Sequence, residues 1–246
     1  MLIEPGLHLV ASGAGGFDLT DAYDCNAWAF AGEFGTLLFD AGAGRAPDAI
    51  LDAGRATGLD WPPPVHLFLT HAHADHAGGA AALRERLAAR VYAGAQTAQW
   101  VSAGDEEAVS LPAARRAGVY PADYRYLPCP VDQVVGEGDR LAFGDLQVAP
   151  IATPGHSADH VAYLVTRGSR RWLVAGDCLF HGGKVVWQDT WDCSVQQTAA
   201  SLRKLTGVHF DALLPGHLAF SLGGAVRHLQ AALERLDRLL LPGSLV

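Results

Sequence analysis

Three histidines and an aspartate occur within six consecutive positions, and this cluster limits what the chain can fold into. They lie in the run Thr70-His71-Ala72-His73-Ala74-Asp75-His76-Ala77-Gly78-Gly79. The run follows residues 65–70, a short stretch rich in β-branched and aromatic residues that predicts a buried strand. Imidazole and carboxylate groups are preferred ligands of divalent transition metals. The cluster therefore predicts a metal centre at a strand end and disfavours a set of ordinary surface histidines.

Three more candidate ligands follow other predicted strands. His156 comes after a Thr-Pro-Gly turn, Asp177 follows an apolar run that ends in Gly176, and His217 comes after a Leu-Pro-Gly turn. Each pattern is weak when taken alone. Loops that leave a rigid scaffold commonly carry functional sites, so their recurrence at strand ends indicates one shared centre.

The remaining pattern predicts an α/β protein with two sheets and helices outside them. The length of 246 residues and 50% hydrophobic content favour a single domain with a sizeable core. We expect strands at residues 36–42, 65–70, 91–94, 140–151, 161–166, 172–175 and 211–214. We expect helices at residues 77–90, within 96–120, at 194–205 with Ser194 as N-cap, and at 222–240.

Composition and charge limit the classes of partner that the chain is expected to bind. The chain carries 18 Lys and Arg against 26 Asp and Glu, a net charge of −8, and has no basic stripe of the kind that binds nucleic acid. It contains no apolar run long enough for a membrane helix, and its first residues lack a signal-peptide pattern. We therefore expect a cytoplasmic protein with reduced cysteines, acting on a small molecule and binding neither nucleic acid nor membrane. The oligomeric state, including a homodimer, stays open.

The ordered set of His71, His73, Asp75, His76, His156, Asp177 and His217 resembles the metallo-β-lactamase superfamily. The resemblance covers nearly the whole chain and implies a four-layer αββα sandwich. It further implies that His71, His73 and His156 hold one metal ion. By the same resemblance, Asp75, His76 and His217 hold a second ion and Asp177 bridges the two. Two divalent ions are expected, with zinc favoured over iron or manganese.

Such a pair of ions implies hydrolysis. A water shared by two cations ionises near neutral pH and becomes a hydroxide nucleophile, which Asp75 would orient as the catalytic carboxylate. We expect a small ester, thioester or lactone as substrate. Three alternatives remain: a mononuclear-iron persulfide dioxygenase that uses His71, His156 and Asp177, a β-lactamase-type amide hydrolase, and a metal-binding protein without turnover.

Departures from the patterns of individual families narrow the choice. The segment from Gly176 to Phe180 resembles a loop of glyoxalase II thioesterases, but only 29 residues follow His217, too few for their glutathione-binding region. Quorum-signal lactonases resemble the chain except that they carry a tyrosine where Phe180 stands. Flavodiiron members carry a glutamate at the position of His73.

Several other residues have two readings. Asp40 is expected to brace a loop or fix a histidine tautomer, whereas His160 is equally a bracing or a structural histidine. Cys178 is expected to pack, and Trp187 and Trp191 either line a pocket or pack, with packing favoured. His181 and Lys184 are either substrate contacts or solvent-exposed residues. A final sequence feature is the insertion at residues 96–130, which contains Trp100, Tyr120, Tyr124 and Tyr126 and is either a helical lid or a packed layer.

Overall fold

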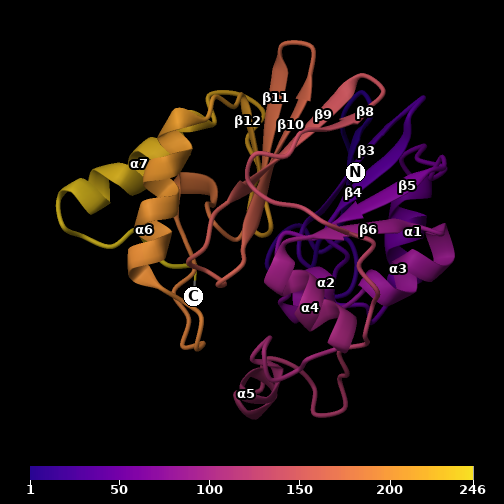
Figure 1. Ribbon diagram of the computed structural model, residues 1–246, viewed down its shortest axis with the longest axis horizontal. Helices are drawn as coiled ribbons and strands as arrows, with labels where there is room; N and C mark the ends of the chain where they lie inside the picture. The colour runs from indigo at the N-terminus through magenta and orange to yellow at the C-terminus, as the bar shows by residue number, and fades with distance from the viewer. Residues whose placement is uncertain (246) are drawn as a thin grey trace. The chain divides into compact units, whose positions relative to one another are not determined.

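The computed structural model describes residues 1–245, and the chain forms two compact units. Unit 1 comprises Met1–Val135, and unit 2 begins at Gly136 (Figure 1). Each unit contains one sheet with its own helices. The mixed α/β character and the two sheets predicted from sequence are confirmed.

Unit 1 is built on a seven-stranded sheet whose strands follow one another in chain order. The strands are β1 (Leu2–Glu4), β2 (Leu7–Ala11), β3 (Ala27–Gly32), β4 (Gly35–Phe39), β5 (Val65–Phe68), β6 (Arg90–Ala93) and β7 (Gln133–Val134). Pairing is antiparallel from β1 to β4 and parallel from β4 to β7. The parallel strands β4, β5 and β6 are largely buried on both faces, which explains why their sequences are mainly apolar, whereas Val134 of the last strand β7 is exposed.

Five helices belong to unit 1: α1 (Pro47–Arg55), α2 (Ala74–Ala77), α3 (Ala80–Leu87), α4 (Ala95–Ala103) and α5 (Leu111–Arg116). Helix α1 packs on β2, α3 packs on β5 and β6, and α4 packs on β6. Figure 1 shows α5 farther from the sheet than the other helices of the unit. The helix predicted at 77–90 is shorter in the structure, where α3 begins at Ala80 and ends at Leu87, and Gly78 and Gly79 separate it from α2.

An aromatic ladder runs across the centre of the unit 1 sheet. Phe39 stacks on Phe68 with ring centroids 5.1 Å apart, and Phe68 stacks on Tyr92 at 4.5 Å. Phe30 meets Phe39 edge-on at 5.8 Å. These residues are almost completely buried, so each ring adds both apolar burial and a favourable pair geometry. The ladder fixes the strands β3 to β6 relative to one another, and the ligand loop leaves from β5.

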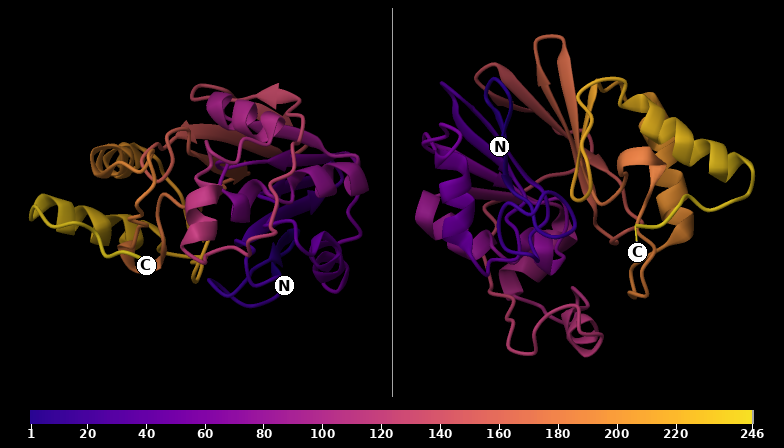
Figure 2. Two further views of the ribbon diagram at one scale, coloured as in Figure 1. Left: turned by 90° about the horizontal axis from the view of Figure 1, so that it is seen from below. Right: turned by 180° about the vertical axis from the view of Figure 1, so that it is seen from behind.

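Unit 2 is built on a five-stranded sheet in the order β12-β11-β10-β9-β8. The elements are β8 (Leu141–Phe143), β9 (Leu146–Ala152), β10 (Val161–Arg167), β11 (Arg170–Gly176), η1 (His181–Gly183), α6 (Val195–Lys204), η2 (Leu205–Gly207), β12 (Ala212–Pro215) and α7 (Val226–Asp237). Helices α6 and α7 lie on the same side of this sheet in Figures 1 and 2. Leu173, Leu202, Leu213 and Leu229 contribute to the core between them.

Three sequence expectations in unit 2 can be checked directly. Ser194 caps α6, because its hydroxyl accepts the amide hydrogen of Gln197 at 3.3 Å. The predicted strand at 140–151 is a hairpin of β8 and β9, which turns at Gly144 with a φ of +55°. The closing helix α7 is shorter than the predicted 222–240: a bridge between Ser221 and Leu213 precedes it, and Leu239 leaves the helical region after it.

Two further observations concern membrane-spanning helices and the cysteines. Among the described residues, no helix has the length and apolar character needed to cross a membrane. The four cysteines are all free thiols.

Candidate metal centre

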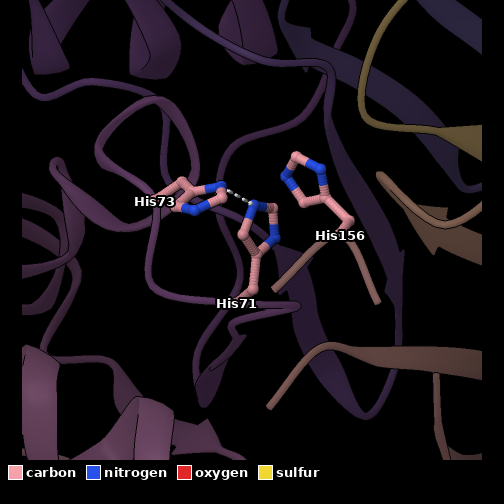
Figure 3. A group of neighbouring side chains, drawn as sticks. All are labelled: His71, His73 and His156. Carbon is pink, nitrogen blue, oxygen red and sulfur yellow. Dashed lines mark hydrogen bonds between the residues drawn. The ribbon is translucent and has the colours of Figure 1, made fainter. Parts of the chain in front are cut away.

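The histidine cluster forms the turn between β5 and α2. In Figure 3 the rings of His71 and His73 point toward each other, and the dashed line joins His71 Nε2 to His73 Nδ1 at 2.9 Å. Asp75 and His76 follow on the short helix α2, where Asp75 Oδ2 lies 3.6 Å from His76 Nε2. His71 and His76 are fully buried, and the Asp75 side chain is 21% exposed. Unit 1 thus gathers all four predicted ligands of its sequence cluster in one turn.

Asp40 holds this turn through hydrogen bonds of its carboxylate. Its carboxylate accepts hydrogen bonds from the Thr70 amide at 2.8 Å and from the Thr70 hydroxyl at 2.9 Å, and His76 Nδ1 lies 2.9 Å from it. An ionised carboxylate can only accept, so His76 carries its proton on Nδ1 and keeps its lone pair on Nε2. The expectation that Asp40 braces the loop and fixes a histidine tautomer is confirmed.

Thr70 fixes a second tautomer. Its hydroxyl donates to Asp40, so the 3.0 Å contact with His71 Nδ1 requires that nitrogen to be the donor. The lone pair of His71 then lies on Nε2, the atom that faces His73. Buried hydrogen bonds of this kind orient metal-binding imidazoles and set their basicity.

Close packing of backbone also shapes the turn. A Cβ atom added to Gly79 would lie 2.1 Å from the carbonyl oxygen of Ala41, and one added to Gly78 would lie 2.4 Å from the carbonyl oxygen of Ala74. Neither position therefore tolerates a side chain. The two glycines let α2 and the start of α3 approach the loop after β4, which carries Asp40.

Unit 2 brings its three predicted ligands to one edge of its sheet. His156 follows β9, Asp177 follows β11 and His217 follows β12. Strands β9, β11 and β12 run in the same direction, so their carboxyl ends share an edge. His156 Nε2 and His217 Nε2 lie 3.4 Å and 3.6 Å from the same oxygen, Asp177 Oδ2. His156 and Asp177 are buried, and His217 is half-buried.

His160 positions the backbone of Asp177. The amide of Asp177 donates to His160 Nε2 at 3.0 Å, which places the proton of the imidazole on Nδ1. His160 Nδ1 then donates to the Thr153 hydroxyl at 2.8 Å, and the same hydroxyl oxygen accepts the Ala162 amide at 3.1 Å. Of the two sequence readings for His160, the structure supports a bracing histidine within unit 2.

The turn before His156 depends on a glycine. Gly155 has a φ of +141°, and a Cβ atom there would lie 2.4 Å from the backbone nitrogen of Thr198 in α6. The Ser194 amide also donates to the Gly155 carbonyl at 2.7 Å. The start of α6 therefore holds the loop that carries His156.

The other candidates have mixed outcomes. Cys178 is buried in the unit 2 core, as expected, and burial raises the pKa of its thiol to about 12. Trp187 packs against that core and donates to the Pro242 carbonyl at 3.0 Å. The packing expected for Trp191 is wrong, because this residue is 64% exposed. His181 and Lys184 are exposed, and the His181 ring lies against His228.

Sequence reasoning missed two features beside the unit 1 ligands. Cys25, Asp40 and His76 place potential ligand atoms within 4.8 Å of one another. Burial raises the pKa of the Cys25 thiol to about 12. The second feature is the contact between the ligand turn and the tyrosines of the insertion, which are evident in the sequence although this contact is not. Neither has a local signal in the sequence, because both depend on contacts between distant segments.

The donor chemistry fits divalent metal ions. Unit 1 offers three imidazoles and a carboxylate, and unit 2 offers two imidazoles and a carboxylate, all of them nitrogen and oxygen donors suited to zinc, iron or manganese. Buried hydrogen bonds fix the Nδ1 atoms of His71 and His76. Another fixes the backbone amide of Asp177. Such bracing is typical of metal sites and unusual for exposed histidines.

Comparison with known proteins agrees with this chemistry. The sequence model that describes the metallo-β-lactamase superfamily matches residues 20–217 of this chain. The acyl-coenzyme A thioesterase MBLAC2 of Gallus gallus is 27% identical over 230 residues, which cover 87% of this chain and 78% of that protein. The hydroxyacylglutathione hydrolase of Cereibacter sphaeroides is 31% identical over 161 residues, covering 62% of this chain and 48% of the relative. The chain thus spans about half the length of that hydrolase.

Solved structures show the same fold. A metallo-β-lactamase with a HARLDQ motif from Cronobacter sakazakii aligns with a TM-score of 0.69 and 22% identity, over 97% of this chain and 86% of that one. The B3 metallo-β-lactamase BLEG-1 aligns with a TM-score of 0.68 and 23% identity, over 85% of this chain and 95% of that one. At this identity the likeness establishes the fold alone.

Proposed function

Because the chain belongs to the metallo-β-lactamase superfamily of metal-dependent hydrolases, we propose that it is a two-metal thioesterase acting on a small acyl thioester, with zinc as the favoured metal. One observation carries the proposal: each unit places its expected donors close together and holds some of them by buried hydrogen bonds within the unit. In unit 1 the bracing groups are Asp40 and Thr70, and in unit 2 they are His160 and Thr153.

The proposed ligand sets draw on both units. His71, His73 and His156 would hold the first ion, and Asp75, His76 and His217 would hold the second. Asp177 would contribute its carboxylate to both. Support comes from the convergence of His71 on His73 in unit 1, and of both unit 2 histidines on one oxygen of Asp177.

When bound, the ions supply Lewis acidity and lower the pKa of a coordinated water toward neutrality. The chain's own groups do the rest. Asp75, on the partly exposed side of the ligand turn, orients the attacking water and accepts its proton. Attack forms a carbon–oxygen bond at the thioester carbonyl, and the carbon–sulfur bond then breaks. The thiol leaving group takes up a proton, so a carboxylic acid and a thiol are the products.

A thioester is favoured over a lactone for two reasons. The relatives named above act, by their names, on acyl-coenzyme A or on hydroxyacylglutathione, and both are thioesters chemically. Phe180 also stands where lactonases resembling this chain carry a tyrosine. Its ring is fully buried with its centroid 6.2 Å from that of His217, so it offers no hydroxyl to a ring-opening step. His181 and Lys184 are exposed on the segment that follows and stay proposals as substrate contacts.

The test combines metal content with a substrate panel. Protein expressed with zinc, iron and manganese available is analysed for bound metal. It is then assayed with acyl-coenzyme A, acylglutathione, aryl ester, lactone and β-lactam substrates. An oxygen electrode with glutathione persulfide runs in parallel. We expect two ions per chain, zinc in excess, thioester cleavage ahead of the other classes, and no oxygen uptake.

Three outcomes would overturn this assignment in different ways. One iron per chain with persulfide-dependent oxygen uptake would establish the dioxygenase. Preferential cleavage of β-lactams would establish an amide hydrolase. Bound metal with no turnover of any substrate class would leave a metal-binding protein without catalysis.

A further inference from the structure

The tyrosines of residues 120–126 converge on the ligand turn of unit 1. The Tyr124 hydroxyl donates to the Ala43 carbonyl at 2.7 Å and lies 3.4 Å from the Ala74 carbonyl. The Tyr126 hydroxyl donates to the Ala72 carbonyl at 2.8 Å. Both side chains are buried, at 7% and 4% exposure. Ala72 and Ala74 alternate with the proposed ligands, so the segment holds the turn at the peptide groups between them.

Tyr120 reaches a proposed ligand itself. Its hydroxyl hydrogen-bonds to the side chain of Asp75. A phenol paired with a carboxylate is the donor, so the carboxylate of Asp75 is the acceptor. Among the tyrosines of this segment, Tyr120 is the one whose hydrogen bond goes to a ligand side chain and not to backbone.

A ring stack fixes the position of Tyr120. Its ring stacks on Tyr124 with centroids 4.9 Å apart and on Tyr23 with centroids 5.4 Å apart. The guanidinium of Arg45 lies 4.7 Å from the centroid of the Tyr23 ring. Two aromatic partners thus hold the ring of Tyr120 in place.

The backbone of the segment is tied down separately. Arg115 of α5 donates to the Tyr124 carbonyl and forms a two-pronged pair with Glu106, at 2.7 Å and 2.8 Å. Glu106 also accepts the Tyr126 amide at 3.1 Å. Bidentate arginine–carboxylate pairs fix geometry as well as charge. The residues 120–126 therefore form a brace that is anchored on α5 at one side and on the ligand turn at the other.

We propose that Tyr120 is a positioning residue that orients Asp75 for the second metal ion. This rests on the proposed function, because it concerns the affinity of the same centre. One oxygen of Asp75 is held by the phenol, so the carboxylate presents its other oxygen in a fixed direction. Substituting hydrogen-bond partners of metal ligands typically lowers metal affinity by ~10–100-fold. The effect of losing the phenol should be selective, since Asp75 is a proposed ligand of the second ion only.

The variants Tyr120→Phe, Tyr23→Phe and Tyr124→Phe separate positioning from packing. Each keeps its ring in the stack and removes one hydroxyl. Tyr120→Phe removes the contact with Asp75. Tyr124→Phe removes hydrogen bonds to backbone carbonyls only. Tyr23→Phe changes the outer ring of the stack and serves as the matched control.

Each protein is titrated with zinc in competition with a chromophoric chelator, which gives two stepwise dissociation constants. Cobalt-substituted protein supplies a visible spectrum of the second site. We expect Tyr120→Phe to weaken one of the two constants by ~10-fold or more and to change that spectrum. The other constant should stay within about twofold, as should both constants of Tyr23→Phe. Tyr124→Phe should lower the melting temperature without selective loss of one ion.

Each alternative result decides the matter. Two unchanged constants for Tyr120→Phe would overturn the role of Tyr120 and leave the proposed function intact. Equal weakening of both constants would show a general loosening of the turn, which also overturns the positioning role. A wild-type protein that binds no zinc, iron or manganese would overturn the proposed function and the role of Tyr120 together.

Discussion

His228 should make the stability of unit 2 fall in mildly acidic solution. This residue of α7 is 3% exposed. Its Nδ1 accepts the Gly182 amide at 2.9 Å, so its proton lies on Nε2, which donates to the Ser221 hydroxyl at 3.0 Å. A doubly protonated ring would face the Gly182 amide with a second donor. Burial, with the nearby His181 and Arg227, lowers the pKa of His228 from 6.5 to about 4.

The sign and size of the effect follow from this difference in pKa. The unfolded chain binds a proton near its ordinary pKa of 6.5, whereas the folded chain resists protonation down to about 4. The contribution of His228 to stability is therefore fully present above about pH 6.5 and is lost as the pH falls toward 4. A pKa difference of about 2.5 corresponds to ~3.4 kcal/mol at most, and solvent screening reduces the loss expected by pH 5 to about 1–2 kcal/mol.

Chemical denaturation at pH 7.5 and pH 5.0 measures this contribution when the wild type is compared with His228→Asn. The asparagine oxygen replaces Nδ1 as acceptor for Gly182 but does not titrate. We expect the stability advantage of the wild type to shrink by about 1–2 kcal/mol between the two pH values. Ser221→Ala should lose about 1 kcal/mol at both values, because it removes a hydrogen bond but keeps the histidine. An advantage over His228→Asn that is equal at both pH values would refute the reasoning.

Three further predictions concern unit 2. Asp177→Ala should lose at least one metal ion and ~100-fold or more in hydrolysis rate, whereas Cys178→Ala should retain both; similar metal content and rates in the two variants would exclude Asp177 as the bridge. Gly155→Ala should lower the free energy of unfolding by about 2 kcal/mol or more, because its Cβ would lie 2.4 Å from the Thr198 nitrogen; thermal melting within a degree of the wild type would contradict this. Thr153→Val should cost about 1–3 kcal/mol in denaturant titrations, because it leaves a buried amide and an imidazole donor unsatisfied, and an unchanged midpoint would show that another group replaces the hydroxyl.

The strand ends that carry the candidate ligands could be predicted because their signals are local. Strands were predicted at 65–70 and 172–175 from short, mainly apolar runs, and the structure has β5 (65–68) and β11 (170–176) there. The Ser194 cap was equally readable. In each case the physical cause lies within a few residues, so one short window contains it.

The predicted ends of helices and strands were wrong where one or two glycines determine them. Periodicity alone extends a helix through Gly78 and Gly79, but these residues are needed where the backbone passes the carbonyls of Ala41 and Ala74. Gly144 likewise turns an apparent long strand into a hairpin. A glycine chosen for close approach is indistinguishable in sequence from one that a helix or strand merely tolerates.

The bracing groups could not be predicted in full because their partners are distant in sequence. Tyr124 and Ala43 are 81 residues apart, and Gly182 and His228 are 46 apart. A tyrosine in an insertion carries no local mark that its hydroxyl will meet a metal-ligand turn. Asp40 was readable as a brace because it ends a strand, but its partners Thr70 and His76 were not.

The proposed metal ligands and the residues that hold them in place are different residues, and this affects how the metal centre forms. Asp40 orients His76 within unit 1, and His160 holds Asp177 within unit 2, so each of these two donors is held by a group of its own unit. Under the proposed function the ions would then bind to preformed sets and would not have to order loose side chains, which lowers the entropic cost of binding. Substitutions at braces should accordingly act on metal affinity before they act on chemistry. Tyr120 is the brace on which this distinction can be tested most directly, because its hydroxyl contacts a single proposed ligand side chain, Asp75.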